Sequence, residues 1–275
     1  MIKTRVAHAM DADNAFRGFS VNDELAGRDG WTSALSLALG GPRLDASTSA
    51  IIEDLAVCSL AADPRIWPLK MARLVASYGV TLPAMAVGHL ALEGAIVGSE
   101  PTGAAAEILI EWSSKLGESP TRERLEAHVS EVMAQGRVPG FGVAFRGHDE
   151  RVSAIKTCIA KRGVVLGRHW GLVTALEDVM LTRTKVRSNL AMASAAVLLD
   201  LGYGPKQIRM WMSAFLDVCF YANVVEAAEQ KSPELLEIAR ETIAYVGRAP
   251  RSSPRALAKG TLDSQSPVLA ETVYR

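Results

Sequence analysis

Apolar residues recur three or four positions apart along most of this chain, and that spacing constrains the fold more than any other feature of the sequence. The spacing predicts helices over residues 51–60, 120–134, 152–161, 172–185, 190–201, 205–229 and 233–244. Runs that alternate apolar and polar residues, as half-buried strands do, are scarce. The sequence therefore predicts an all-α protein with roughly ten or more helices joined by short loops.

The apolar residues are of a kind that favours close packing of helices. Hydrophobic residues make up 49% of the chain and aromatic residues only 6%, so Ala, Leu and Val carry most of the hydrophobic fraction. Ala and Leu are strong helix formers, and Ala loses no side-chain entropy on burial. With 275 residues, the chain is long enough to bury a full core, as one large domain or two small ones.

Charge and cysteine usage argue against several classes of partner. The 30 basic and 30 acidic residues give a net charge of +0, whereas a nucleic-acid or membrane-surface binder would show a basic excess. The cysteines Cys58, Cys158 and Cys219 are widely spaced and form no C-x-x-C, which argues against a disulfide framework or a zinc site. No uncharged apolar run reaches the roughly 18 residues of a membrane span, and the N-terminus shows no signal-peptide pattern. We therefore expect a cytoplasmic protein without nucleic-acid, membrane or metal partners.

Residues 137–151, which read R-V-P-G-F-G-V-A-F-R-G-H-D-E-R, carry the strongest functional signal. A Pro-Gly-x-Gly sequence between helices can be a tight turn that needs a positive φ at glycine. It can also let backbone groups approach a ligand closely, because glycine has no side chain. The cations that follow, Arg146, His148 and Arg151, suit a polyanionic or carboxylate ligand. Both interpretations stay open at this level.

This stretch resembles the glycine-rich signature of the citrate synthase superfamily, P-G-F-G-H followed by D-P-R. Residues 139–142, Asp149 and Arg151 match it. Weaker resemblances to other motifs of the family, in the family's order, cover residues 16–27, 35–44, 61–77, 188–202 and 240–247. The resemblance covers nearly the whole chain and is closest to the short members that are similar to citryl-CoA lyase.

The resemblance implies an all-α, two-domain fold and an assembly. A large helical domain would comprise residues 1–98 and 203–275, with a smaller helical domain, residues 99–202, inserted into it. The chain would form a homodimer or pair with a paralogous subunit. Its small-molecule ligand, an acyl-CoA or a carboxylate, would lie in the cleft between the domains, whose closure excludes water. Coenzyme A would be the co-substrate or acyl carrier, and no metal is implied.

The resemblance also assigns roles to individual residues. The family's loop at the adenine end of coenzyme A corresponds, with one cation after it, to Val138, Pro139, Gly140, Phe141, Gly142 and Arg146. Two arginines that hold substrate carboxylates, the second of them across the dimer interface, match Arg151 and Arg240. Further substrate-binding candidates are Arg65, Arg187 and Asn189. The candidate catalytic groups are His148, Asp149 and Asp63.

The chain departs from the family at the positions that carry its chemistry. Where the family has two catalytic histidines and an aspartate, the matching residues are Val97, Val143 and Ala191. Two further histidines and an arginine of the family correspond to Pro64, Asn223 and Leu216. Positioned acid–base groups typically contribute ~10²–10⁴-fold each, and valine or alanine cannot transfer protons. The sequence therefore argues against the family's standard reaction and indicates a more apolar pocket for a bulkier or less polar ligand.

Two functional hypotheses follow. The first is a divergent enzyme that acts on an acyl-CoA or a related thioester or carboxylate, by C–C bond formation or cleavage or by hydrolysis, with non-standard catalytic residues. The second is a catalytically inactive protein that binds a metabolite or regulates a paralogous partner. A helical scaffold unrelated to the family is a third, weaker alternative. Two helix histidines are interpreted as structural, His89 in the core and His128 at the surface or half-buried.

Overall fold

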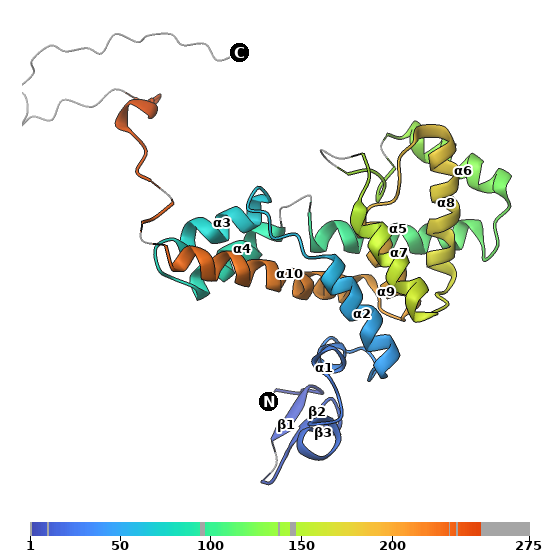
Figure 1. Cartoon of the computed structure of the whole chain (residues 1–275), viewed down its shortest axis with the longest axis horizontal. Helices are drawn as coiled ribbons and strands as arrows, with labels where there is room; N and C mark the ends of the chain where they lie inside the picture. The colour runs from blue at the N-terminus through green and yellow to red at the C-terminus, as the bar shows by residue number, and fades with distance from the viewer. Residues whose placement is uncertain are drawn as a thin grey trace, which may run out of the picture. The chain divides into compact units, whose positions relative to one another are not determined.

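Helices dominate the computed structural model, which describes residues 2–9, 11–93, 97–136, 138–143, 147–230, 232–234 and 236–248 (Figure 1). In chain order the α-helices are α1 (Trp31–Ala38), α2 (Ala46–Cys58), α3 (Trp67–Ala76), α4 (Leu82–Glu93), α5 (Ser99–Leu116), α6 (Arg122–Ala134), α7 (Glu150–Arg162), α8 (Arg168–Thr184), α9 (Leu190–Asp200) and α10 (Pro205–Ala228). A π-helical turn, η1 (Val21–Leu25), precedes them, and a 3₁₀ turn, η2 (Arg240–Thr242), follows them. The predicted all-α architecture is confirmed.

One predicted helix is capped as its sequence indicates, and another is absent. The helix predicted over residues 120–134 is α6, and the Thr121 side chain caps it by accepting the N–H of Arg124. The helix predicted over residues 233–244 is wrong, because the described residues there form only η2. Leu236, Ile238 and Ile243 are exposed in that segment, so no buried face stabilises a helix.

Three short strands at the N-terminus form a sheet that the sequence did not predict. The strands β1 (Ala7–Ala9), β2 (Asn14–Phe16) and β3 (Phe19–Ser20) pair antiparallel in that order. The turn between β2 and β3 uses Arg17 at φ 51° and Gly18 at φ 90°. Strands of this length are too short to show an alternating pattern, which explains why the periodicity missed them.

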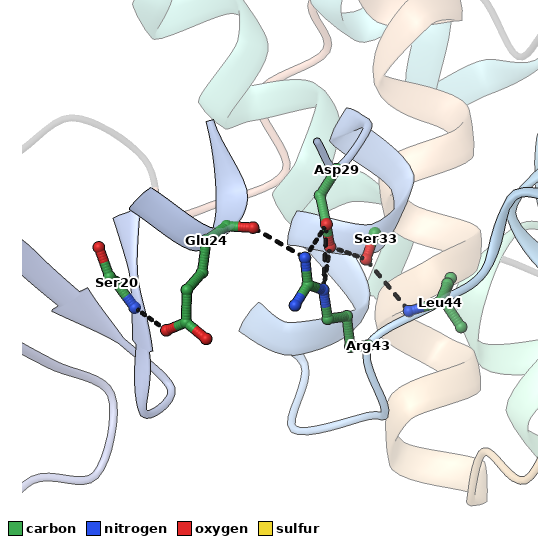
Figure 2. Close-up of polar contacts among 6 residues, drawn as sticks. All are labelled: Ser20, Glu24, Asp29, Ser33, Arg43 and Leu44. Atoms are coloured by element: carbon green, nitrogen blue, oxygen red, sulfur yellow. Dashed lines mark hydrogen bonds and ion pairs between the residues drawn. The ribbon is translucent and has the colours of Figure 1, made fainter. Parts of the chain in front are cut away.

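A polar network fastens this N-terminal region to α1 (Figure 2). Nε of Arg43 donates to both carboxylate oxygens of Asp29, at 3.0 and 2.9 Å, and Nη2 donates to the Glu24 carbonyl at 2.7 Å. The Ser33 hydroxyl donates to Asp29 and accepts the N–H of Leu44. Hydrogen bonds from Arg43 and Ser33 hold the pKa of Asp29 below its ordinary value, so this carboxylate is charged at neutral pH.

Helix α9 lies at the centre of the main core, among α5, α7 and α8 (Figure 1). Every side chain from Met192 to Leu198 is buried. Three of these residues are alanines, which allow neighbouring helices to approach closely. A helix buried on all sides shows little amphipathic contrast, and the run 190–201 accordingly has few polar residues.

Helix α10 joins the main core to a second, smaller apolar cluster. It packs on α5 and α3 and also contacts α2, α4 and α9. The second cluster comprises residues of α3, α4 and α10: Leu69, Ala72, Ala76, Ala84, Leu92, Cys219, Phe220, Val224 and Ala227. By length and composition alone α10 could cross a membrane, and 44% of its apolar 18-residue window is buried inside the protein. Packing against five other helices accounts for the buried part of that apolar composition.

The chain divides into two compact units, residues 1–235 and residues 236–275. All of α1–α10 belong to the first unit. The predicted insertion of residues 99–202 would begin at Gly98, the N-cap of α5, and end at Gly202, between α9 and α10. Both glycines have a positive φ, of 91° and 90°. The division into a large and a small domain at these turns stays a prediction.

Candidate functional site

The glycine-rich loop pairs with the segment that leads into α9. The Gly142 N–H donates to the Arg187 carbonyl at 2.9 Å, and the Asn189 N–H donates to the Gly140 carbonyl at 2.9 Å. These bonds flank an antiparallel bridge between Phe141 and Ser188. Two stretches that resemble separate family motifs, residues 138–142 and 187–190, therefore form one structural unit, which we call the paired loop.

Two glycines of the paired loop need the conformations that only glycine adopts easily. Gly140 has φ 77° and Gly142 has φ 84°, as the tight-turn interpretation predicted. A Cβ atom on Gly140 would lie 2.3 Å from Cε of Met192 and 2.9 Å from its Cβ. Asn189 stabilises the same turn, because its Nδ2 donates to the Gly142 carbonyl and its Oδ1 caps α9. The backbone of the paired loop is thus tightly specified by its packing on α9.

Asp149 ties the paired loop to α7. Its side chain is almost fully buried, and it caps α7 by accepting the N–H of Arg151. It also accepts two bonds from the Arg151 guanidinium, at 2.7 and 2.8 Å, and one from the Leu190 N–H at 2.9 Å. Burial by itself would raise the pKa of Asp149, but these hydrogen bonds and the charge of Arg151 hold it below the ordinary value. Asp149 is therefore an ionised carboxylate that orients Arg151.

A second buried carboxylate, Glu177 of α8, gathers cations on the other side of the paired loop. It accepts hydrogen bonds from Lys156 of α7 and from the Ser188 hydroxyl, each at 2.9 Å. One Arg187 guanidinium nitrogen lies 3.7 Å from it. The side chain of Glu177 is 3% exposed, whereas that of Arg187 is 50% exposed. Arg187 therefore presents its charge to solvent while its carbonyl holds the loop.

An apolar pocket lies at the paired loop and includes a histidine. Its lining comprises Trp112, His128, Val129, Val132, Val138, Phe141, Leu176 and Met180. The prediction that His128 is at the surface or half-buried is wrong, because it is 4% exposed. Neither of its ring nitrogens has a hydrogen-bond partner among the described residues. Burial, with the charge of Lys115 as a second cause, lowers the pKa of His128, so the ring is neutral at neutral pH.

Comparison with solved structures identifies this architecture. No protein-family model and no curated protein sequence matches the chain. Citryl-CoA lyase from Hydrogenobacter thermophilus matches with a TM-score of 0.77 at 21% identity, over 94% of this chain and 99% of that one. ATP citrate lyase from Methanosaeta concilii, in complex with (3S)-citryl-CoA, matches with a TM-score of 0.69 at 14% identity, over 94% of this chain and 43% of that one. The chain has the citrate-synthase fold.

Citrate synthase itself is longer than this chain. The enzyme from Thermotoga maritima matches with a TM-score of 0.57 at 17% identity, over 80% of this chain and 58% of that one. The chain thus spans nearly all of the citryl-CoA lyase but less than two thirds of the ATP citrate lyase and the citrate synthase. The citrate-synthase fold agrees with the resemblance found in residues 137–151.

The other predicted site residues that the structure describes lie in three different parts of the chain. His148 is exposed and directly precedes Asp149, and Arg146 lies outside the described residues. Asp63 and Arg65 form an ion pair with each other at the surface, in the turn before α3. Arg240 belongs to the second compact unit, in η2. Among the candidates that the structure describes, it brings together the residues of the paired loop, Asp149 and Arg151.

The positions that the sequence predicts to be replaced relative to the family lie in two places. Val143 directly follows the paired loop, and Ala191 lies in the first turn of α9, two residues after Asn189. Both are half-buried. Val97 precedes α5 and is 37% exposed. The side chains at these positions in the citrate-synthase fold are apolar, as the sequence shows.

One acid–base pair was missed by the sequence reasoning. Nε2 of His89 in α4 lies 2.6 Å from Asp217 in α10, and Nδ1 lies 2.8 Å from the Met85 carbonyl. The two side chains are 34% and 35% exposed, so His89 is not a core residue. Leu92, one helical turn after His89, and Leu216, which directly precedes Asp217, flank Gly98. No spacing signal links positions 128 residues apart, so only the fold reveals this pair.

The described residues contain no group of three or more side chains that could hold a metal ion. The groups at the paired loop are cations, hydroxyls and backbone amides rather than clustered metal ligands. Such an arrangement can bind an anion through the guanidinium groups of Arg151 and Arg187.

Proposed function

We propose that this chain binds a coenzyme A thioester at the paired loop. One observation carries the proposal: a glycine backbone that is fixed in place lies beside two partly exposed arginines, Arg151 and Arg187. Guanidinium groups bind phosphates and carboxylates in a bidentate manner, and both occur in acyl-CoA ligands. A solved ATP citrate lyase with this fold holds (3S)-citryl-CoA, which supports the same ligand class here.

The proposed roles follow from the contacts. Arg151, held by Asp149, and Arg187, held by Glu177, bind the anionic parts of the ligand. Asn189 maintains the shape of the paired loop. We propose Asp149 as a positioning residue rather than a proton-transfer group, because all its described bonds hold it in the ionised form.

Further roles rest on motif position. His148, exposed beside the paired loop, is the proposed proton-transfer group, with Asp63 as a second candidate. Arg65 and Arg240 are proposed as additional arginines for the carboxylate of the ligand. The loop residues Val138, Pro139 and Phe141, with Arg146, are proposed to contact coenzyme A.

We propose C–C bond formation or cleavage on the acyl group, of the lyase or acyltransferase type, or hydrolysis of the thioester. The structural similarity to a citryl-CoA lyase supports cleavage as the reaction. Val97, Val143 and Ala191 are apolar and indicate a more apolar pocket, so the proposed acyl group is bulkier or less polar than citryl. This chemistry would proceed without a metal and in the cytoplasm.

A second candidate function is a metabolite-binding protein without catalysis. It is favoured by the same three apolar residues and by the engagement of Asp149 and Glu177 in ion pairs. Such a protein would keep the coenzyme A site while regulating a paralogous partner. Turnover separates the two candidates, because both predict binding.

We also propose that the chain forms a homodimer through α10. Four large apolar side chains of this helix are each more than half exposed: Met210, Val218, Tyr221 and Val225. Their spacing places them along one face of the helix. A second copy would cover this apolar face, which a monomer would leave in water.

The enzyme proposal predicts turnover that depends on Arg151. The purified protein is incubated with a panel of acyl-CoAs, including citryl-CoA, and the coenzyme A species are separated and quantified over time. We expect consumption of at least one thioester, and a fall in kcat/KM of about 100-fold in Arg151→Ala, because a charge-assisted contact is lost. Arg122→Ala, which removes an exposed arginine paired with Glu126 in α6, is the matched control and should keep full activity. Binding of coenzyme A without any turnover would favour the second candidate, and neither binding nor turnover would refute both.

A further inference from the structure

An ion pair fixes how helices α2 and α7 are aligned against each other. Arg162, the last residue of α7, binds the carboxylate of Asp54 in α2 through Nε and Nη2, the latter at 2.9 Å. Next to this pair, Ile51 and Leu55 of α2 and Ile155 and Ile159 of α7 line one narrow apolar pocket, to which Cys158 also contributes. The two helices therefore meet along a defined face.

This register places two cysteines opposite each other. Cys58 lies one helical turn after Asp54 in α2, and Cys158 lies one turn before Arg162 in α7. The two thiols are close enough for Cys158 to contribute to the raised pKa of the Cys58 thiol. Both side chains are half-buried and both cysteines are reduced, whereas Cys219 is buried in α10. No local sequence signal indicates this pairing, because 100 positions separate the two residues.

We propose that Cys58 and Cys158 form a reversible disulfide that ties α2 to α7. Cys58 is the last residue of α2, and the chain at a helix end can adjust to bring the sulfur atoms to bonding distance. Cytosolic disulfides are typically transient and redox-sensing rather than structural. The proposal does not depend on the function assigned to the paired loop.

The chemistry requires an oxidant that accepts two electrons and two protons. A low-molecular-weight disulfide is one: a thiolate of the pair attacks it and expels one small thiol, and the second cysteine then expels the other. The S–S bond of the oxidant breaks, the Cys58–Cys158 bond forms, and two small thiols leave. Burial, with the neighbouring Cys158 as a second cause, raises the pKa of the Cys58 thiol to about 11. Few Cys58 thiolates exist at neutral pH, so oxidation by air alone is slow.

The link would change the mechanics of the chain. It closes a loop between positions 58 and 158, which restricts the unfolded chain and raises stability. It also fixes α2, from the segment before residue 98, to α7, from the predicted inserted domain. Where those two domains move against each other, as the predicted division implies, the oxidised form moves less.

The experiment uses the full chain and diamide, an azo compound that takes up the two hydrogen atoms of two thiols. Protein is treated at pH 8.5, the excess reagent is removed, and free thiols are counted after denaturation. We expect the count to fall from three to one, and a non-reducing peptide map to join the peptides that contain Cys58 and Cys158. The melting temperature should rise by about 10 °C and return on reduction.

Variants assign the bond. Cys58→Ser and Cys158→Ser should each abolish the monomeric cross-link and the rise in melting temperature, whereas Cys219→Ala should keep both. The wild-type peptide map decides the outcome even where a variant folds poorly. Three free thiols after treatment, a bond to Cys219, or a bond only between two chains would each overturn the proposal.

Discussion

Replacing Gly140 with alanine should lower the free energy of unfolding by about 3 kcal/mol and abolish coenzyme A binding. Gly140 has φ 77°, a conformation that costs an alanine roughly 1–2 kcal/mol. The added Cβ would also lie 2.3 Å from Met192 Cε and 2.9 Å from Met192 Cβ, and overpacking of this kind costs about 1–3 kcal/mol. Because Met192 is fully buried in α9, the loop must shift away from Asn189. Urea denaturation and calorimetric titration with coenzyme A measure the two effects.

Gly147→Ala is the control for this substitution. Gly147 lies in the same stretch of sequence, and a Cβ atom there would meet no atom within 4 Å. This control should change the free energy of unfolding by less than about 0.5 kcal/mol. A Gly140→Ala protein as stable as the control would contradict the packing of the paired loop on α9.

Asp149→Asn should lower the free energy of unfolding by about 3 kcal/mol. Asp149 is almost fully buried and accepts bonds from Arg151 and from the Leu190 N–H. An asparagine keeps the shape but leaves the Arg151 guanidinium without its counter-charge, and breaking one half of a buried pair is strongly destabilising. Asp178→Asn, on the exposed face of α8, should be nearly neutral by the same denaturation measurement.

The same variant should also change how stability depends on pH. The pKa of Asp149 is lower in the folded protein than its ordinary value, and an unfolded aspartate titrates near 3.9. Its contribution is therefore complete above about pH 4–5 and is lost as the pH falls through the lower, folded pKa. The wild type should lose more stability below pH 4 than Asp149→Asn does. An equal loss of stability below pH 4 in the two proteins would show that Asp149 does not form a buried ion pair with Arg151.

Much of the fold follows from local sequence, whereas parts of the site do not. The 3.6-residue period and the cap at Thr121 predict α6, and the Pro-Gly-Phe-Gly sequence predicts the positive φ at Gly140 and Gly142. Periodicity cannot reveal strands of two or three residues. It also predicts a helix over residues 233–244 that no buried face supports.

Contacts between distant positions set the character of the site. His128 lies beside the apolar stripe of its helix, and residues distant in sequence that line the same pocket, among them Trp112, Phe141 and Met180, make it interior. Asp149 stands at the aspartate position of the motif that the sequence resembles. Its bonds to Arg151 and Leu190 indicate that it holds an ion pair rather than transfers a proton. The same limitation hid the pair His89–Asp217 and the facing thiols of α2 and α7.

The central claim is that the paired loop binds coenzyme A, and hydrogen–deuterium exchange with and without coenzyme A tests it most directly. The amides of Gly142, Asn189 and Leu190 are already hydrogen-bonded in the free chain, so ligand binding should slow their opening further. We predict that saturating coenzyme A increases protection in the peptides that cover residues 138–143 and 187–192, and leaves β1–β3 unchanged. Unchanged exchange in both of those peptides at saturating coenzyme A would contradict the claim.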